Sequence, residues 1–453
     1  MRKKVIATML CMCLLAGMTG CAGGENTGED TPVFDTISDS SGVSVEDLAD
    51  GDLPTETPPA DVQVMETVNL MEGVERADVS VLDILPSIPI TRFGVPLLQN
   101  AIKEAEAGEN VLVSPLSAWT VLCMVEGGAD GDTKTQMQNA LGIAGGNHQS
   151  YLMGYTYKLP AGVGYQVNMA NGIWYKNVPS LHVEDSFLQY NKSFFDATAY
   201  KAPFNKNTLQ EINNWVSENT DGMIPSILDE IKEEDVMYLL NALSFDAEWK
   251  RIYNETEIWK DVFTTETGSE RLVPMMHSEE SVYLEDELAT GFMKYYKGEK
   301  YAFVALLPKE GTSVANYVES LTAEGLSSLL NSPVYCPVET TMPKFSTEYS
   351  FELNEILQQM GMKDAFSEDA ADFSKMATSD IGNIYISKVL QKTFIAVDEK
   401  GTKAGAATAV AMANKMALLD KKKVNLNRPF VYMIIECEYN EPLFIGTLMD
   451  VEQ

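Results

Sequence analysis

Few side chains in this sequence have the spacing that catalysis or metal binding requires. His148, His182 and His277 are far apart along the chain, and His277 has acidic neighbours in "VPMMHSEE". A lone histidine of this kind is more typical of a surface or a strand end than of a general base. The sequence has no G-x-S-x-G elbow, P-loop, HExxH pair or strand-turn-helix G-x-G-x-x-G. We therefore expect no enzyme and no metal or cofactor site, and a surface hydrolase is the weakest function class.

Residues 398–416, "DEKGTKAGAATAVAMANKM", have a different character. Four charged residues occur among the first six, and the next eleven are uncharged and mostly Ala, Gly or Thr. Alanine is the best helix former, so a buried helix is one interpretation. In a strand, alternate side chains would share one uncharged face, formed by Thr402, Ala404, Ala406, Thr408, Val410 and Met412. Such a face can enter a sheet without burying an unpaired charge.

The N-terminus has the pattern of a targeting signal. Arg2, Lys3 and Lys4 precede an apolar run over residues 5–16 that is too short for a lasting membrane span. The run ends in "LAGMTGC", which resembles a lipobox and implies that residues 1–20 are a lipoprotein signal peptide and that Cys21 is lipidated. An ordinary signal peptide followed by an incidental cysteine is the alternative. Either way the mature protein is expected outside the cytoplasm, anchored to the bacterial cell surface by lipid alone or secreted.

Three cysteines lie beyond this signal region, and none has a cysteine nearby in sequence. Cys123, Cys336 and Cys437 each have apolar neighbours. Their odd number argues against a disulfide framework, so we expect buried, unpaired thiols.

The charge distribution divides the chain into two parts. The 66 acidic and 33 basic residues give a formal net charge of -33, which repels phosphate backbones and excludes nucleic acid as an expected partner. Residues 22–87 contain 16 Asp or Glu against the single basic residue Arg76. That composition predicts a disordered acidic tether over residues 21–87, with a span of roughly 45 Å. Residues 88–453 have the composition of one globular domain.

Helical and strand patterns are mixed within that domain. Helices are predicted at residues 90–106, 208–219, 313–330 and 350–360, and another has Ser114 as N-cap and Pro115 in its first turn. Hairpins are predicted to turn at Lys297-Gly298 and Asn440-Glu441, and residues 383–399 alternate for long enough to form one central strand. The pattern predicts an α+β domain.

Seven blocks of sequence, in order along the chain, resemble the serpin family of serine protease inhibitors. They are "NVLVSPLSAWTVLCMVEGGADGDTKTQM", "INNWVSENTDGMI", "LLNALSFDAEW", "VPMM", "MPKFSTEYSFELNEILQQMGMKDAFSEDAADFSKM", "IYISKVLQKTFIAVDEKGTKAGAAT" and "RPFVYMIIECEYNEPLFIGTLMDV". The resemblance covers residues 88–453. It implies a monomer without cofactors, with the serpin fold of three β-sheets, eight or nine helices and an exposed reactive-centre loop near the C-terminus.

The resemblance also implies a mechanism. In this family a protease cleaves the loop as a substrate and forms an acyl-enzyme. The cut loop then inserts into the large sheet and distorts the attached protease. The implied partner is therefore a serine protease held in a covalent acyl complex. A non-inhibitory serpin, acting as a surface binding module whose loop never inserts, is the alternative, and the small residues through Val410 favour the inhibitor.

The family's spacing also implies the reactive bond. Fifteen residues counted from Gly401 inclusive place it between Lys415 and Met416. A lysine at the cleavage site suits a specificity pocket with a carboxylate, which indicates trypsin-like proteases. A small change of register would instead favour chymotrypsin-like or subtilisin-like targets, and cysteine proteases remain a further alternative.

Other positions match the family's structural residues. Glu399 and Gly401 correspond to the hinge, where Gly401 is expected to supply backbone freedom, and Lys403 replaces the usual glutamate on a face expected to be solvated. The implied polar residues where the sheet opens, and the tryptophan beyond them, are Ser114, Ser117, Asn241, Gln391 and Trp249. Gln391 stands where a histidine is frequent.

Overall fold

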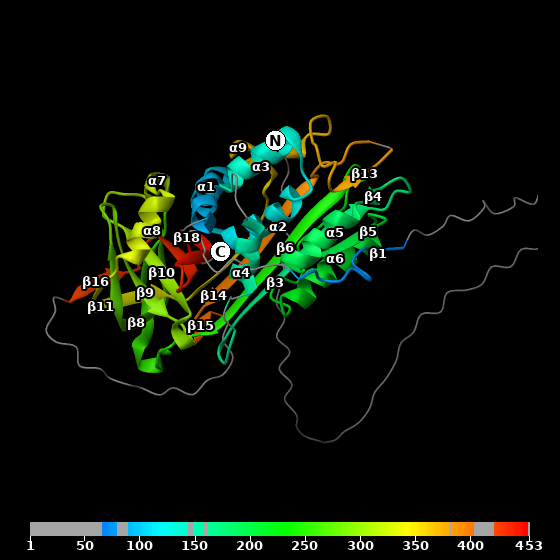
Figure 1. The fold of residues 1–453 in the computed structure, drawn as a ribbon. Coiled ribbons are helices and arrows are strands. Elements are labelled where there is room, and N and C mark those ends of the chain that lie inside the picture. Colours follow the sequence, from blue (N-terminus) through cyan, green and yellow to red (C-terminus); the bar gives the residue numbers. More distant parts are fainter. Residues whose placement is uncertain are drawn as a thin grey trace, which may run out of the picture. The chain divides into compact units, whose positions relative to one another are not determined.

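Two large β-sheets organise the structure, a computed structural model that describes residues 66–78, 89–143, 148–157, 159, 161–380, 382–402 and 421–451 (Figure 1). Together with a small two-stranded sheet of β4 (His182–Val183) and β13 (Ala377–Thr378), they make three sheets in the described chain. The predicted α+β class and the predicted number of three sheets are confirmed. All described residues belong to one unit that begins at Gln63.

The first sheet has seven strands in the order β1-β5-β3-β6-β15-β14-β12. Their bounds are β1 Val68–Asn69, β5 Thr198–Ala202, β3 Tyr165–Lys176, β6 Met237–Glu248, β15 Gly401–Thr402, β14 Lys388–Val397 and β12 Phe345–Glu352. β6 is buried along almost its whole length, because a strand covered on both faces needs a continuous apolar run. β14 alternates buried and half-buried positions and confirms a central strand there, although the strand covers only residues 388–397 of the predicted 383–399.

The second sheet has nine strands, eight of them in the order β16-β11-β8-β9-β10-β17-β18-β2, with β7 beside β8. They are β16 Lys422–Asn425, β11 Val334–Pro343, β8 Glu270–Glu285, β9 Ala289–Tyr295, β10 Tyr301–Pro308, β17 Phe430–Glu436, β18 Glu441–Leu448, β2 Val111–Val113 and β7 Ile258–Thr264. β10, β17 and β18 are buried at every position and form the centre of the core. Both predicted hairpins, β9–β10 and β17–β18, are present.

Nine α-helices occur in the described residues. They are α1 Pro89–Glu104, α2 Pro115–Glu126, α3 Gly131–Leu141, α4 His148–Tyr157, α5 Asp185–Phe195, α6 Lys206–Asn219, α7 Val314–Ser320, α8 Ala323–Asn331 and α9 Asn354–Gln359. Every residue of α2 is buried, and its N-cap is the predicted Ser114, whose side chain accepts a hydrogen bond from Ser117 N. α6 packs on the β3–β6 part of the first sheet through a separate apolar cluster (Figure 1). No helix in the described ranges is both long enough and apolar enough to cross a membrane.

Two helix predictions need correction. The single helix predicted over residues 313–330 is two helices, because Leu321 is extended and the Thr322 side chain caps the start of α8. The helix predicted from residue 350 begins only at Asn354, since β12 continues to Glu352 as the neighbour of β14.

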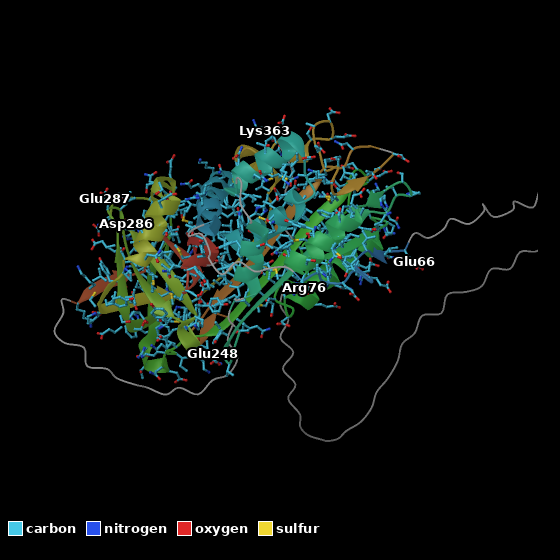
Figure 2. All side chains as sticks on the ribbon, in the orientation of Figure 1. Glu66, Arg76, Glu248, Asp286, Glu287 and Lys363 are labelled. Atoms are coloured by element: carbon cyan, nitrogen blue, oxygen red, sulfur yellow. The ribbon has the colours of Figure 1, made fainter. Side chains whose placement is uncertain are left out.

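Residues 66–78, which the composition assigns to the tether, lie against the first sheet. β1 pairs antiparallel with β5, and Leu70 N donates to Ala199 O at 2.8 Å. Met71 is 8% exposed within the main core. Glu66 and Arg76, near the two ends of this segment, are labelled in Figure 2. The acidic composition concealed this docking, because it depends on only a few apolar side chains and on backbone pairing.

Candidate functional site

The seam between β6 and β14 is the centre of the candidate site. The two strands pair in parallel over only three positions, from Lys388–Tyr238 to Leu390–Leu240. At the far end β15 lies between them, with Thr402 opposite Ala247 of β6 and Val397 of β14. The sheet is therefore closed directly at one end of the seam and begins to accept an extra antiparallel strand at the other.

Polar side chains begin where the direct pairing stops. Gln391 follows the last paired residue of β14, and its Oε1 accepts a hydrogen bond from Ser114 N at 3.0 Å. Its Nε2 donates to Ser114 O at 2.9 Å, and Ser114 Oγ donates to Leu443 O at 2.7 Å. The side-chain amide thus bonds both backbone groups at the start of α2, which an amide can do without a change of protonation.

The matching position on β6 is also polar. Asn241 accepts a hydrogen bond from Ser117 Oγ and donates its own amide to Asn171 of β3. Asn171 in turn donates to Phe195 O at 3.3 Å. Asn241 and Ser117 are 3% and 2% exposed, and buried polar groups of this kind are normally fully bonded. The sequence indicated Ser114, Ser117, Asn241 and Gln391, and the structure brings them together, whereas Asn171 was missed.

Trp249 closes the opposite end of the seam. Its indole Nε1 donates to Asp398 O at 2.8 Å, and its backbone N donates to Lys400 O at 2.7 Å. Its ring stacks on Tyr296 with centroids 4.4 Å apart and planes 12° apart. The Tyr296 and Thr402 hydroxyls are 2.6 Å apart. The turn from β14 into β15 is therefore held at a fixed place.

Glu399 in this turn forms an ion pair with Lys344. The hydrogen bond from the Lys344 ammonium is the main influence that lowers the pKa of the Glu399 carboxyl from its ordinary value. Sequence reasoning found Glu399 but could not identify Lys344, because a pair 55 positions apart leaves no local pattern.

The structure gives Gly401 a steric role beside the expected backbone freedom. Its φ is not among the positive values of the described glycines. A Cβ at this position would lie 2.0 Å from Ala247 O and 2.9 Å from the Glu248 Cα. Glycine is thus needed because β15 approaches the β6 backbone closely.

Several predicted site residues lie outside the described ranges. These are Cys21, the loop positions Ala404, Ala406, Thr408, Val410 and Met412, and the reactive bond Lys415–Met416. The described chain resumes at Lys421, which forms ion pairs with Glu279 and Glu339 at 3.1 and 3.6 Å. β16 follows and pairs in parallel with β11.

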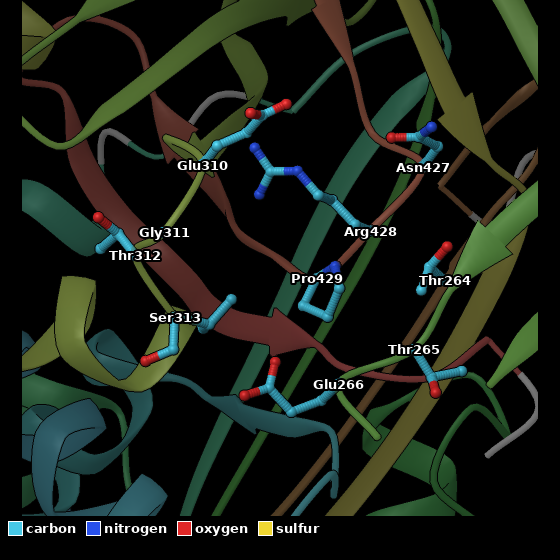
Figure 3. A pocket seen from close by; sticks show the side chains of 11 residues that line it. Thr264, Thr265, Glu266, Glu310, Gly311, Thr312, Ser313, Asn427, Arg428 and Pro429 are labelled. Atoms are coloured by element: carbon cyan, nitrogen blue, oxygen red, sulfur yellow. The ribbon is translucent and has the colours of Figure 1, made fainter. Parts of the chain in front are cut away.

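A polar pocket of about 490 Å³ lies where β16 leads into β17 (Figure 3). Arg428 points into it, donates to Pro308 O, and faces Glu310. Burial raises the pKa of Glu266 on its other side. The pocket has charged and hydroxyl groups, but none of its lining residues is a histidine or cysteine.

The sequence singled out His277 as the one possible base, and it lies in a packed position. Its ring stacks on Trp259 with centroids 3.4 Å apart, and Nδ1 is 3.1 Å from Thr341 Oγ1. Burial is the main cause that lowers the pKa of His277. Across the described residues, no three His, Cys, Asp or Glu side chains form a metal-binding group.

Comparison of the sequence with known proteins identifies one family over nearly the whole described chain. A family profile described as "Serpin (serine protease inhibitor)" matches residues 89–451. An uncharacterized serpin-like protein of Thermococcus kodakarensis is 31% identical over 352 residues, covering 75% of this chain and 80% of that protein. Neuroserpin of Mus musculus is 28% identical over 384 residues, covering 81% and 92%.

Solved structures give the same result. The thermophilic serpin tengpin in the native state is 42% identical, with a TM-score of 0.81 over 85% of this chain and 100% of that one. The same protein in the latent state gives 41% identity and a TM-score of 0.73 over 82% and 100%. The described fold is thus more similar to that native state than to that latent state.

Proposed function

The chain belongs to the serpin family, and from this premise we propose that it is an extracytoplasmic serine protease inhibitor that traps its target by inserting a cleaved loop between β6 and β14. Members of this family are generally protease inhibitors and not catalysts. The observation that carries the proposal is β15, which already lies between the two strands at one end of the seam.

The register of β15 supports insertion of the residues that follow it. β15 is antiparallel to both neighbours. Each further residue of the loop would therefore face the preceding residue of β6 and the preceding residue of β14. Extended in this way from Thr402, Ala406 would face Leu243 and Thr393, and Thr408 would face Asn241 and Gln391. These neighbours are buried, so small uncharged side chains suit the inserted strand, as the predicted alternation requires.

The opposite face of such a strand would not be uniformly solvated. Lys403 would lie beside Asp246, which is half-buried, and the position suits a basic residue. Further along, Ala409 and Ala411 would face Leu240 and Tyr238, which are buried in the apolar cluster with α6. Because α6 covers this face of the sheet, small alanine side chains suit the inserted strand on this face as well.

The free energy of insertion is sufficient for inhibition. A strand of about ten residues paired on both sides gains on the order of ten to twenty backbone hydrogen bonds, each worth about 1 kcal/mol. Moving a catalytic group by about 1 Å can reduce a rate about a hundredfold. A part of the insertion energy would therefore stop deacylation.

We assign the reactive bond to Lys415–Met416 and the target to the trypsin-like class, because lysine pairs with a carboxylate in such pockets. The remaining assignments concern location. Residues 1–20 are proposed as a lipoprotein signal peptide, Cys21 as the lipid attachment site, and the acidic stretch up to residue 65 as the tether. The domain is proposed to act as a monomer.

Incubation with trypsin, with chymotrypsin in parallel, tests the proposal. We expect a covalent adduct with trypsin on a denaturing gel. The released C-terminal peptide should have the mass of a fragment that begins at Met416. Lys415→Ala should abolish the trypsin adduct, whereas Lys421→Ala, beyond the reactive bond, should retain it. Cleavage without any adduct would instead support a non-inhibitory binding module, and an adduct with Lys415→Ala would move the reactive bond.

A second variant tests insertion itself. Ala406→Arg would place a charge beside Leu243 and Thr393, which are 3% and 2% exposed, so insertion should slow and the protein should become a substrate. Ala406→Ser is the matched control and should still trap trypsin. Equal trapping by both variants would contradict insertion in this register.

A further inference from the structure

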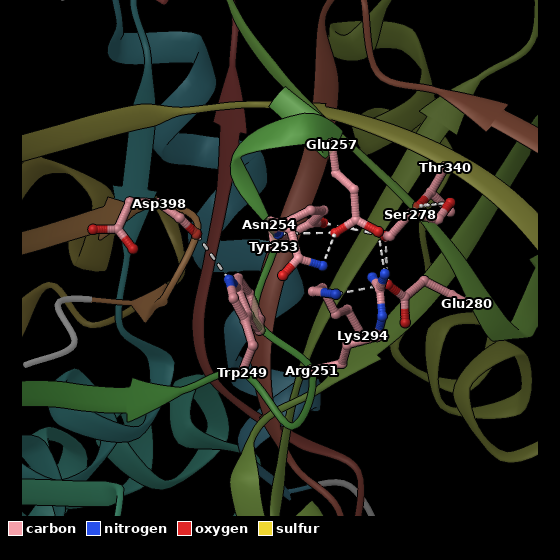
Figure 4. A network of polar contacts seen from close by, with 10 residues as sticks. All are labelled: Trp249, Arg251, Tyr253, Asn254, Glu257, Ser278, Glu280, Lys294, Thr340 and Asp398. Atoms are coloured by element: carbon pink, nitrogen blue, oxygen red, sulfur yellow. Dashed lines mark hydrogen bonds and ion pairs between the residues drawn. The ribbon is translucent and has the colours of Figure 1, made fainter. Parts of the chain in front are cut away.

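An ion pair with a buried lysine lies close to the turn that leads into β15. Lys294 of β9 is 1% exposed, and its Nζ is 2.7 Å from Glu280 Oε1 of β8. The same ammonium lies 4.3 Å from the ring centroid of Tyr253 and 5.4 Å from that of Trp249. Figure 4 shows the group at the meeting point of several strands.

The surroundings of Lys294 favour its charged form. Burial alone would lower the pKa of the Lys294 ammonium, but the Glu280 carboxylate and Tyr253 outweigh burial and the pKa is raised. Lys294 is therefore a cation at neutral pH. Removal of Glu280 would leave the Lys294 ammonium buried without its counter-charge, which is strongly unfavourable, whereas the Glu280 side chain is 14% exposed.

One side of the pair reaches the N-terminal end of the reactive loop. The two rings over the ammonium belong to the residues that hold the hinge turn. Tyr253 N donates to Glu399 O at 2.9 Å, and Trp249 Nε1 donates to Asp398 O at 2.8 Å. The ammonium thus attracts the faces of both rings and helps to hold them in place.

The other side reaches the C-terminal end of the loop. Ser278 Oγ donates to Glu280 Oε1 at 2.6 Å and lies 3.0 Å from Thr340 Oγ1. Thr340 is on β11, and its register partner on β16 is Val424. The polar chain therefore runs from the hinge to β11, and β11 pairs with β16, the first described strand after the loop.

We propose that the Lys294–Glu280 ion pair is a positioning element that couples the two ends of the reactive loop and thereby sets how fast the cleaved loop enters the seam. This inference rests on the proposed insertion mechanism. A well-packed apolar pair of similar volume would stabilise the fold at least as well in many proteins. A role in fixing geometry is therefore the better explanation for two charges at this place.

Lys294→Met tests the proposal, with Lys294→Arg as the conservative variant. We expect Lys294→Met to raise the moles of inhibitor consumed per protease trapped by about twofold to thirtyfold, the range for losing one contact in a coupling network. Lys294→Arg should restore most of the trapping. Lys309→Met is the control, because Lys309 pairs with Glu285 at 3.2 Å in the same sheet with side chains 40% and 43% exposed.

Melting temperatures distinguish positioning from simple destabilisation. A merely structural role would lower the Tm of the native and the cleaved protein and leave the trapping ratio unchanged. If Lys294→Met does not fold, Glu280→Gln supplies the test, since it removes the acid but keeps an acceptor for Ser278, and the ratio should rise less. Two results would overturn the proposed coupling but not the proposed function. One is a folded variant of the ion pair with an unchanged ratio of inhibitor consumed to protease trapped, and the other is an equal rise of this ratio in Lys309→Met. A wild-type protein that traps no protease would overturn the proposed function as well.

Discussion

At the scale of single residues, the hinge ion pair Glu399–Lys344 should make stability depend on pH in a defined direction. The folded pKa of Glu399 lies below the ordinary value of 4.5. Its contribution is therefore complete above pH 4.5 and is lost as the pH falls through the folded pKa. The Glu399 side chain is 33% exposed, so solvent screens the pair and its contribution is small.

Glu399→Gln should lower the Tm at pH 7 by up to about 2 °C. The difference between the two proteins should stay constant down to about pH 5 and shrink at lower pH, when measured by thermal unfolding in matched buffers. Other carboxylates titrate equally in both proteins, so the difference isolates this group. A Tm gap that widened in acid would refute the assigned sign.

Lys403 provides a second prediction at this scale, because its neighbour after insertion would be Asp246. Lys403→Glu places two carboxylates side by side in the inserted strand, and like charges across strands cost about 0.2–1 kcal/mol. The inhibitor consumed per trapped protease should rise about two- to fivefold. Lys403→Ala, which only removes the attraction, should show a smaller change, and identical ratios for the two variants would argue against this register.

At the scale of elements, the segment 66–78 should stabilise the domain through its docking on β5. Met71→Ala removes a side chain that is 8% exposed within the core, and such truncations cost about 2 kcal/mol or more. The Tm should fall by several degrees, and deletion of the whole segment should lower it further. Val163→Ala is the control, since Val163 is 85% exposed and its loss should leave the Tm unchanged.

The same scale shows what the sequence could predict. The alternation of apolar residues was enough to predict β14 and both hairpins, and the Ser114 N-cap was enough to predict the start of α2, because these signals are local. Leu321 and Thr322 divide a continuous helical pattern through a cap that only its geometry reveals. The docking of residues 66–78 depends on the edge of β5, more than a hundred positions away, and an acidic composition gives no sign of it.

The candidate site divides in the same way. Glu399 and Gln391 were identified because they stand at positions that the serpin resemblance marks, whereas their contacts with Lys344 and Ser114 O are known only from the fold. Lys294 is the clearest example of a residue whose environment the sequence conceals. A charged residue within a strand is normally expected to be exposed, but Lys294 is only 1% exposed. Compensation by Glu280 makes this burial possible, and that contact exists only in three dimensions.

At the scale of the whole molecule, the unused pairing capacity of the seam is the property that matters. β6 and β14 pair directly at three positions, while each offers a longer edge to an incoming strand. On the proposed mechanism, a form in which residues 403–412 fill the seam would be more stable than the native protein. Cleavage at the proposed bond Lys415–Met416 would separate the loop from β16 and would allow these residues to enter the seam.

The cleaved protein should accordingly have a higher Tm than the uncleaved protein. A gain on the order of ten net hydrogen bonds at about 1 kcal/mol each corresponds to an increase of roughly 10–20 °C for a domain of this size. Thermal unfolding before and after limited trypsin treatment measures it, with Ala406→Arg as the control, because that variant should be cut with little gain. Since the new strand forms only if the register from Thr402 continues along both β6 and β14, a cleaved wild-type protein with an unchanged Tm would mean that the seam does not open.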